Sequence, residues 1–360
     1  MILPKKNVRK LERVENPPIS RRGFLRLDKN ENIIGFEDSF LKKVRSKIDS
    51  DFLTSYPEVH LLYEKISKWL GIEKNRIYIS SGSDGCIKSV FEVFVGEGDE
   101  VIVPHPTYAM YYVYSQMFGA KLKKISYNRD LSLNYRSIID AMSKRTKLIC
   151  IANPNSPTGT VIPKRDLLDI VKTAQKKDIL VLVDEAYHPY YPESFLPHVS
   201  SFSNLVVTRS FTKGLGLGSA RLGFAVSNKY IIDCLKKVRP IYEVNSFSVL
   251  LGCLVLDNLS IMKKNMKLFK EGKSYLIQSL KSIGLKFFDT RTNFILIDMG
   301  TPKLVSKISE ELLKRKILVR PGYTEPPLDR CIRVTIGNKK QMKKFIKNLR
   351  AALKLEGVCP

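Results

Sequence analysis

One lysine of this sequence lies where covalent chemistry is favoured. Lys213 comes shortly after the apolar run 204–208, which is predicted to be a buried strand, and has hydroxyl side chains and glycines around it. A lysine that enters a cleft among other cations loses basicity, and its neutral amine becomes a nucleophile. Ser210, Thr212 and Arg221 provide hydroxyl groups and a guanidinium, which together suit a phosphate. A nucleophilic amine beside a phosphate site indicates pyridoxal 5′-phosphate (PLP), whose aldehyde reacts with lysine. The alternative is a solvated lysine in a glycine-rich loop.

A carboxylate ends another apolar run, 180–183. Asp184 is predicted to be buried there, and a buried carboxylate needs a cation or hydrogen-bond donors. A protonated pyridine nitrogen would be such a partner, and the pairing would keep the ring able to accept electrons. Tyr187, three residues further on, is placed to reach a hydroxyl group of the same ring. The alternative is that Asp184 and Glu185 cap the next element.

Glycine and hydroxyl residues also follow the predicted strand 77–80. The backbone N–H groups of Gly82, Ser83 and Asp84 would open a helix, where such groups bind phosphate, and glycine allows close approach. The alternative is an ordinary capped turn. Tyr108 begins a later helix and could stack on a planar ring, with core packing as the alternative.

The turn 153–160 contains two prolines and a glycine after a predicted strand, and such a rigid turn can present a side-chain amide to a ligand. Near the C-terminus, Arg320 and Arg333 lie close to the ends of predicted strands, and Arg333 has apolar neighbours on both sides. An unpaired cation is costly there, and arginine binds carboxylate or phosphate through two parallel hydrogen bonds. Each arginine is therefore a candidate substrate ligand, and a structural salt bridge is the alternative.

Short apolar runs alternate with helical patterns from residue 76 onward, which predicts a largely parallel sheet with helices on both faces. Ligands of such sheets bind at the carboxyl ends of the strands, and the candidate segments of this region follow strands. Residues 246–283 are predicted to be mainly helical with a break at 257–258, and the remainder to form a smaller α+β unit. The predicted strands are 77–80, 101–104, 122–126, 148–152, 180–184, 205–208 and 224–226, with 294–299, 317–320 and 332–336 in the smaller unit. The predicted helices are 38–50, 59–70, 84–94, 107–118, 134–142, 164–177, 302–315 and 338–354.

Composition excludes several classes of protein. The 360 residues include 61 Lys and Arg against 35 Asp and Glu, a net charge of +26, but these cations are scattered over most helices. They are interpreted mainly as solvated helix faces, so no specific nucleic acid is expected as a partner. No apolar run is long enough for a membrane span, and residues 1–10 lack the apolar core of a secretory signal. The six cysteines and four histidines show neither paired nor metal-ligand spacing, which predicts a cytoplasmic protein with reduced thiols and no metal site.

Taken together, the motifs resemble the PLP-dependent aminotransferases of fold type I, and within them the histidinol-phosphate aminotransferases. The resemblance covers residues from about 27 to 350 and would imply an α/β fold. A large domain would hold a mostly parallel sheet between helices, and a smaller α+β domain would follow. The expected division is an N-terminal arm at 1–30, which contains Pro17 and Pro18, a PLP-binding domain at 31–250 and a small domain at 251–360. The matching motifs are S-G-S-D at 81–84, P-T-Y at 106–108, N-P-N-S-P-T-G at 153–159, D-E-A-Y at 184–187, S-F-T-K at 210–213, V-R-P at 319–321 and C-I-R-V-T-I-G at 331–337.

The resemblance also implies roles for individual residues around the cofactor. Lys213 would bind the PLP aldehyde as a Schiff base and carry a proton during the reaction. Asp184 would hold the ring nitrogen, Tyr187 would bond to the ring oxygen, and Tyr108 would stack on the ring. Asn155 is expected to contact the ring oxygen, although many members of the family have a second Asn where this chain has a serine. The cofactor phosphate would be bound by Gly82, Ser83, Asp84, Ser210, Thr212 and Arg221.

Other residues would recognise the substrates or the second subunit. Tyr56 would reach the phosphate bound to the neighbouring subunit, which implies a homodimer with shared active sites. Arg333 would bind the carboxylate of the amino-acid donor, and Arg320 would bind the phosphate of the other substrate. Tyr242 and Asn245 belong to the segment R-P-I-Y-E-V-N at 239–245, which lies near the substrate in the family.

The expected function is transfer of an amino group between a glutamate-like amino acid and a small phosphorylated substrate, with histidinol phosphate as the first candidate. Two alternatives use the same cofactor. One is an aminotransferase that makes a phosphorylated amine for polysaccharide biosynthesis, and the other is a decarboxylase of a phosphorylated amino acid. A third alternative is a binding protein on a catalytic scaffold, and the presence of Lys213, Asp184 and Tyr187 argues against it.

Overall fold

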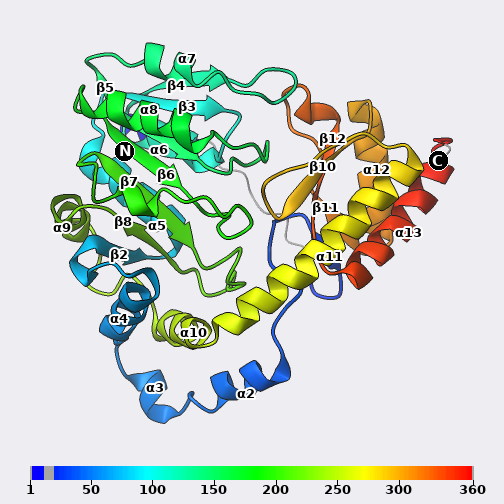
Figure 1. Ribbon diagram of the computed structural model, residues 1–360, viewed down its shortest axis with the longest axis horizontal. Helices are drawn as coiled ribbons and strands as arrows, with labels where there is room; N and C mark the ends of the chain where they lie inside the picture. Colours follow the sequence, from blue (N-terminus) through cyan, green and yellow to red (C-terminus); the bar gives the residue numbers. More distant parts are fainter. Residues whose placement is uncertain (1, 12–19, 359–360) are drawn as a thin grey trace.

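A large sheet and a smaller α+β unit, both predicted from the sequence, make up the computed structural model, which describes residues 2–11 and 20–358 (Figure 1). Pro17 and Pro18 of the predicted arm, and Cys359 among the predicted reduced thiols, lie outside the described residues. The predicted α/β fold is therefore confirmed, and the domain limits at 30/31 and 250/251 stay a prediction.

The large sheet has seven strands in the order β2-β8-β7-β6-β5-β3-β4. Only β8 runs antiparallel to its neighbours, β2 and β7, and the other pairs are parallel. All seven predicted strands are present. Six of them are almost entirely buried and stand out in the sequence as apolar runs, whereas the edge strand β4 is only partly buried. The strands are β2 (Ile77–Ser80), β3 (Glu100–His105), β4 (Lys121–Ser126), β5 (Thr146–Ala152), β6 (Leu180–Asp184), β7 (Leu205–Ser210) and β8 (Gly223–Val226).

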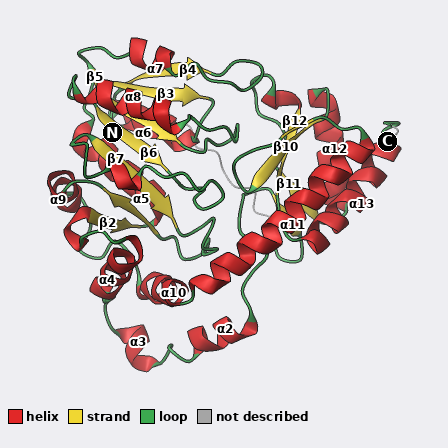
Figure 2. Cartoon of the chain, in the orientation of Figure 1, coloured by secondary structure: helices red, strands yellow, loops and turns green. Residues whose placement is uncertain are grey.

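Helices cover both faces of this sheet (Figure 2). In β6, Val181 and Val183 pack against one set of helices and Leu180 and Leu182 against the other, because side chains alternate along a strand. The first set is α4 (Val59–Leu70), α7 (Arg136–Asp140), α8 (Lys164–Gln175) and α10 (Ser246–Asp257). The second set is α5 (Gly82–Phe94), α6 (Ala109–Met117) and α9 (Lys229–Lys237), of which α9 was not predicted.

The smaller unit contains two sheets packed against long helices. One sheet is antiparallel in the order β12-β10-β9, and the other pairs β1 in parallel with β11. Apolar side chains of these strands form one cluster with the helices. The elements are β1 (Leu25–Leu27), β9 (Phe287–Phe288), β10 (Phe294–Asp298), β11 (Ile317–Val319), β12 (Cys331–Thr335), α11 (Leu259–Ile283), α12 (Pro302–Lys314) and α13 (Lys339–Leu355).

The N-terminal part of the chain differs from its prediction. The end of the expected arm forms β1, and Leu27 is fully buried in the smaller unit, so this segment is part of the fold there. Before it, the described part of the arm contains the short helix α1 (Lys6–Arg9). The predicted helix 38–50 is two helices, α2 (Asp38–Arg45) and α3 (Ser50–Thr54). The side chain of Asp49 accepts a hydrogen bond from Phe52 N at 2.8 Å and so starts the second helix.

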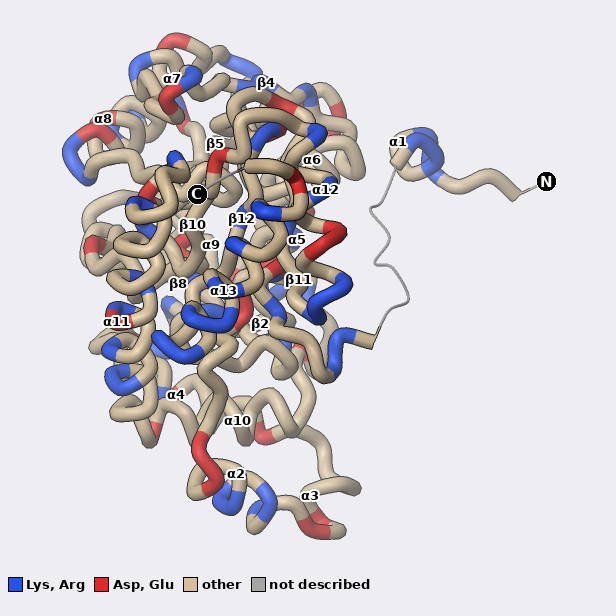
Figure 3. Tube along the Cα trace, turned by 90° about the vertical axis from the view of Figure 1, so that its right-hand side faces the viewer, with Lys and Arg blue, Asp and Glu red and all other residues tan. Residues whose placement is uncertain are grey.

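The predicted break near 257–258 is a 76° bend between α10 and α11. No helix within 2–11 or 20–358 is by itself long and apolar enough to cross a membrane, and these two satisfy the length and composition criteria only when taken together across the bend. Lys and Arg lie over many elements, including α8, α11 and α13, as predicted (Figure 3).

The long helix α11 comes very close to the chain after β12 at one glycine. A Cβ added to Gly272 would lie 1.9 Å from the carbonyl oxygen of Gly337, so the backbones must separate if the residue is larger. We expect Gly272→Ala to lower the free energy of unfolding by at least about 1–3 kcal/mol, the usual cost of overpacking, although alanine favours helices. Chemical denaturation would measure the change.

Gly96→Ala is the matched control, because its added Cβ would meet nothing closer than 3.5 Å. Equal unfolding free energies for Gly272→Ala and the unchanged protein would contradict the close approach.

Candidate active site

A cavity of about 780 Å³ lies between the carboxyl ends of the large sheet's strands and the smaller unit. It brings together side chains that are far apart in the sequence. Twelve of the sixteen predicted site residues line it: Gly82, Ser83, Asp84, Tyr108, Asp184, Tyr187, Ser210, Thr212, Lys213, Arg221, Arg320 and Arg333. Tyr56, Asn155, Tyr242 and Asn245 do not.

Lys213 follows β7 and directs its amine into this cavity. Its Nζ donates a hydrogen bond to the carbonyl oxygen of Lys29 at 3.1 Å. Desolvation, followed by the positive charge of Arg333, lowers the pKa of Lys213 to about 8, with Arg221 acting in the same direction. Its amine is therefore neutral in roughly one molecule in ten at pH 7, far more often than an ordinary lysine, and the neutral form is the nucleophile.

Asp184 ends β6 and is 4% exposed. Its carboxylate accepts hydrogen bonds from Thr208 Oγ1 at 2.9 Å, from Ala186 N at 3.2 Å and from Tyr111 Oη at 3.3 Å. Desolvation outweighs these donors and raises the pKa of Asp184 to about 6. The carboxylate thus has hydrogen bonds but no ion pair among the described residues, so a cationic group in the cavity would stabilise it.

Two glycines make room for a small anion at the start of α5. Gly82 has φ +82°, and a Cβ there would lie 3.0 Å from a guanidinium nitrogen of Arg221. A Cβ on Gly223 would lie 2.1 Å from Ser83 N. The backbone N–H groups of the helix start and the guanidinium therefore meet closely, which is the donor set that a phosphate needs. Ser210 lies beside them and accepts a hydrogen bond from the backbone N–H of Thr212 at 3.1 Å.

Two tyrosines lie on the cavity wall where a planar ring would fit. Tyr108 packs edge-on against Tyr111 with 5.7 Å between ring centroids, and its hydroxyl donates to Asp84 at 3.3 Å. Tyr187 is 6% exposed and lies with its ring 6.0 Å from Lys213 Nζ. Burial raises the pKa of Tyr187, so its hydroxyl keeps its proton.

The geometry does not support the prediction for Asn155. Its amide is already bonded within the protein, since Oδ1 accepts from Thr107 Oγ1 at 2.6 Å and Nδ2 donates to Pro106 O at 2.9 Å and to Thr158 Oγ1 at 2.8 Å. The side chain therefore holds the turn together. Ser156, the next residue, lines the cavity instead.

Arg333 and Arg320 come from neighbouring backbone positions in the smaller unit, bonded to each other through N–H and C=O groups at 3.1 and 2.8 Å. The guanidinium of Arg333 donates to Tyr323 Oη at 2.8 Å and to Asp28 O at 2.6 Å, while its buried Nε has no partner within the described chain. Arg320 is exposed and lies over the ring of Tyr323 at 5.7 Å. Both guanidinium groups thus retain N–H donors for an anionic ligand.

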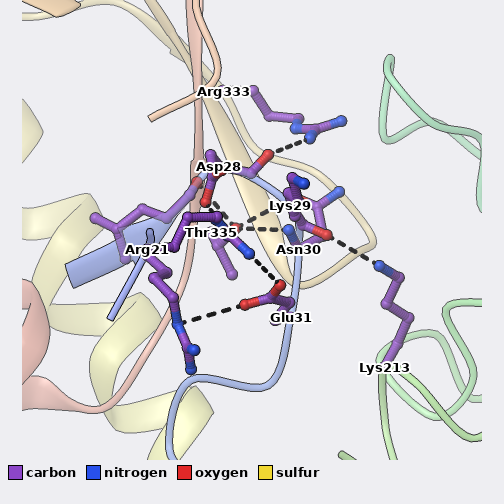
Figure 4. A network of polar contacts seen from close by, with 10 residues as sticks. Arg21, Asp28, Lys29, Asn30, Glu31, Lys213, Arg333 and Thr335 are labelled. Carbon is purple, nitrogen blue, oxygen red and sulfur yellow. Dashed lines mark hydrogen bonds and ion pairs between the residues drawn. The ribbon is translucent and has the colours of Figure 1, made fainter. Parts of the chain in front are cut away.

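One segment of the site was predicted only as a turn. Residues 28–31 form a network with Lys213, Arg333, Thr335 and Arg21, which comes from the predicted arm (Figure 4). Arg21 pairs with Asp28 at 2.5 Å and Glu31 at 2.6 Å and lines the cavity. These contacts join positions up to about 300 residues apart, and no local pattern in the sequence reports such pairing.

Tyr56 and Tyr242 lie outside this cavity and stack on each other, with ring centroids 4.6 Å apart and an angle of 4° between ring planes. Tyr56 is 76% exposed and the nearby Ile241 is 87% exposed. Asn245 accepts a hydrogen bond from Ser248 N at 2.9 Å and caps α10. Within one chain, therefore, none of these residues contacts the predicted cofactor site.

Sequence comparison decides the family. The profile of "Aminotransferase class I and II" matches residues 25–349. The chain belongs to the class I and II aminotransferase family. It is 32% identical over 322 residues to the histidinol-phosphate aminotransferase of Clostridium novyi, covering 88% of each chain. The enzyme of that name from Methanocaldococcus jannaschii is 31% identical over 340 residues, covering 92% of this chain and 90% of the relative.

A solved structure has the same fold: the histidinol-phosphate aminotransferase of Sinorhizobium meliloti in complex with PLP superposes with a TM-score of 0.87, at 23% identity over 98% of each chain. Enzymes of this family use PLP, so the protein is a PLP-dependent, histidinol-phosphate aminotransferase-like enzyme, as predicted. The neutral amine of Lys213, the buried Asp184 and the glycine-lined phosphate pocket fit the aldehyde, ring nitrogen and phosphate of that cofactor. No group of three or more potential metal ligands occurs among the residues described.

The lowered pKa of Lys213 predicts how fast cofactor-free protein takes up PLP. A neutral amine is needed for attack on the aldehyde, so the rate should rise with pH up to about 8 and then level off. An ordinary lysine, with a pKa of about 10.4, would give a rate still rising about tenfold per pH unit at pH 9. Stopped-flow measurement of the visible absorbance gives the profile, and borohydride reduction followed by peptide mapping should place the label on Lys213. A label on another lysine would contradict the assignment.

Proposed function

We propose that this enzyme moves an amino group between a glutamate-like amino acid and a small phosphorylated substrate, with histidinol phosphate as the first candidate. The observation that carries the proposal is one cavity that holds both Lys213 with Asp184 and the two arginines of the smaller unit. The named relatives support the choice of substrate, because both are histidinol-phosphate aminotransferases and this chain matches them over most of their length.

We assign roles according to which atoms face the cavity. PLP, when bound, supplies the electron-accepting ring on which amino groups are exchanged. Lys213 would hold the cofactor and later move the proton of the substrate carbon. Asp184 would keep the ring nitrogen protonated, and Tyr187 would donate a hydrogen bond to the ring oxygen. Arg333 would bind the carboxylate of the amino acid through its two-pronged guanidinium, and Arg320 would bind the phosphate of the other substrate.

A homodimer with shared sites is part of this proposal. Tyr56 and Tyr242 lie with Leu53 and Ile241 in an exposed apolar region, which a partner subunit would cover. Tyr56 would then reach the phosphate in the partner's cavity. A cytoplasmic location also belongs to the proposal, since the described cysteines are free thiols.

A panel of phosphorylated amines with 2-oxoglutarate tests the proposed reaction directly. Glutamate and carbon dioxide should be measured in the same samples. We expect glutamate to form with histidinol phosphate, without carbon dioxide. Carbon dioxide without glutamate would favour the decarboxylase instead. Glutamate formed only with another phosphorylated amine would show that histidinol phosphate is not the substrate.

Lysine substitutions separate the two arginines. Lys keeps the charge but loses the planar fork, so Arg333→Lys should raise KM for glutamate by about tenfold or more, a loss of about 1.4 kcal/mol. Arg320→Lys should instead reduce the preference for a phosphorylated over a dephosphorylated amine. Steady-state kinetics on both substrates would measure each ratio. An unchanged preference in Arg320→Lys would make Arg320 structural.

Removal of one hydroxyl tests the shared site. Tyr56→Phe keeps the ring that stacks on Tyr242 but removes the hydrogen bond to phosphate, worth about 1.5–3 kcal/mol. PLP should therefore dissociate about tenfold to a hundredfold faster, while the thermal midpoint of the cofactor-free protein stays unchanged. Tyr230→Phe is the matched control, since Tyr230 is 75% exposed on α9. A fully active monomer in sedimentation would contradict the proposal.

A further inference from the structure

Asn30 is a buried residue held by contacts from several parts of the chain. It is 2% exposed and has φ 55°, a left-handed conformation that asparagine tolerates better than most residues. Its N–H donates to Thr335 Oγ1 at 3.0 Å, and its carbonyl accepts from Asn293 Nδ2 at 3.0 Å. Both partners are themselves buried. The backbone of Asn30 is therefore fixed against the smaller unit, and this fixes the position from which its side chain extends.

That side chain reaches the cavity wall. Its Nδ2 donates a hydrogen bond to Tyr187 Oη at 2.8 Å, and its Oδ1 lies 3.3 Å from Thr335 Oγ1. An amide NH₂ group only donates, so the oxygen of Tyr187 must accept this bond. The proton of the tyrosine hydroxyl is then left for a partner on the cavity side, which Tyr187 itself lines.

We infer that Asn30 is a positioning residue, which turns the hydroxyl proton of Tyr187 into the cavity and toward the ring oxygen of PLP. The inference rests on the proposed site, because it takes Tyr187 to be the group that meets this oxygen. The neighbours of Asn30 act in the same place: Lys29 O accepts from Lys213 Nζ at 3.1 Å, and Asp28 O accepts from Arg333 at 2.6 Å (Figure 4). Three successive residues thus each hold a different side chain of the cavity.

Two substitutions at this position test the direction of the hydrogen bond. Asn30→Asp keeps the shape and the tolerance for positive φ, but its carboxylate accepts the tyrosine proton and so reverses the bond. Asn30→Gly keeps the backbone conformation and removes the donor. The readout is the pH at which the visible absorbance of the PLP-loaded protein changes from its low-pH to its high-pH form. A donor to the ring oxygen stabilises negative charge there, so losing it makes the chromophore hold its proton more strongly.

We expect both variants to raise that apparent pKa by about one unit or more, from the usual strength of a hydrogen bond to a charged group. Tyr187→Phe should give a similar rise, and Asn30→Gly combined with Tyr187→Phe should add nothing to it. Charges near Tyr187 are those of Arg333 and Lys213, with Tyr323 as a further titratable group, and all variants retain them.

Asn32→Asp is the matched control. It adds the same charge two residues along, but the side chain of Asn32 bonds to Ile34 N at 3.0 Å and not to Tyr187. Asn32→Asp should raise the apparent pKa of the visible absorbance much less than Asn30→Asp does. Thermal unfolding checks that each variant folds. If Asn30→Asp does not fold, Asn30→Gly alone serves as the test.

If both Asn30 variants keep the apparent pKa of the unchanged protein while Tyr187→Phe raises it clearly, the role of Asn30 is overturned and the proposed function is left intact. No shift in Tyr187→Phe would remove the inference for another reason, since Tyr187 would then not meet the ring oxygen. Absence of visible absorbance in the unchanged protein after addition of PLP would instead count against the proposed function itself.

Discussion

The active site is organised around one buried carboxylate. Asp184 ends the central strand β6, where burial raises its pKa to about 6 despite donors from β7 and α6. A raised aspartate pKa means that the unliganded protein becomes more stable as pH falls through about 6, and that above this value the charged form destabilises it. The fold tolerates this cost at the carboxyl edge of the sheet, where a cation from a ligand can offset it. Destabilised groups of this kind are concentrated at functional sites.

Burial in the same cavity also penalises positive charge, so it lowers the pKa of a lysine where it raises that of an aspartate. Desolvation and Arg333 lower the pKa of Lys213, so the cavity contains a neutral amine at pH values where lysine is ordinarily charged. Arg221 and Arg320 also face the cavity, and they leave room for anions. A cofactor with an aldehyde, a basic ring nitrogen and a phosphate, together with a substrate that carries carboxylate or phosphate, satisfies these groups simultaneously. The family membership and the electrostatics therefore agree.

The sequence predicted the sheet because most of its strands are short, continuous apolar runs; the partly exposed edge strand β4 is the exception. It also predicted which strand ends carry Lys213 and Asp184, since Asp184 directly follows such a run and Lys213 comes shortly after another. It did not predict that Ser156, and not Asn155, lines the cavity, because both lie in one rigid turn and only the folded geometry shows which side chain bonds within it. The site segment around Asn30 was also missed. Asn30 matters because it bonds to Tyr187 and Thr335, which lie far along the chain, and because it has a positive φ. The presence of an asparagine does not by itself predict either feature.

The most direct test of this account compares thermal unfolding of the unchanged protein and Asp184→Asn, each without cofactor and saturated with PLP, at a pH well above 6. The asparagine can keep the bonds to Thr208 and Ala186 but carries no charge. If the buried charge is costly until a cationic ring binds, the cofactor-free variant should melt at a higher temperature than the unchanged protein, and PLP should stabilise it far less. A variant that melts lower without cofactor and gains as much from PLP would contradict the central role of the Asp184 charge.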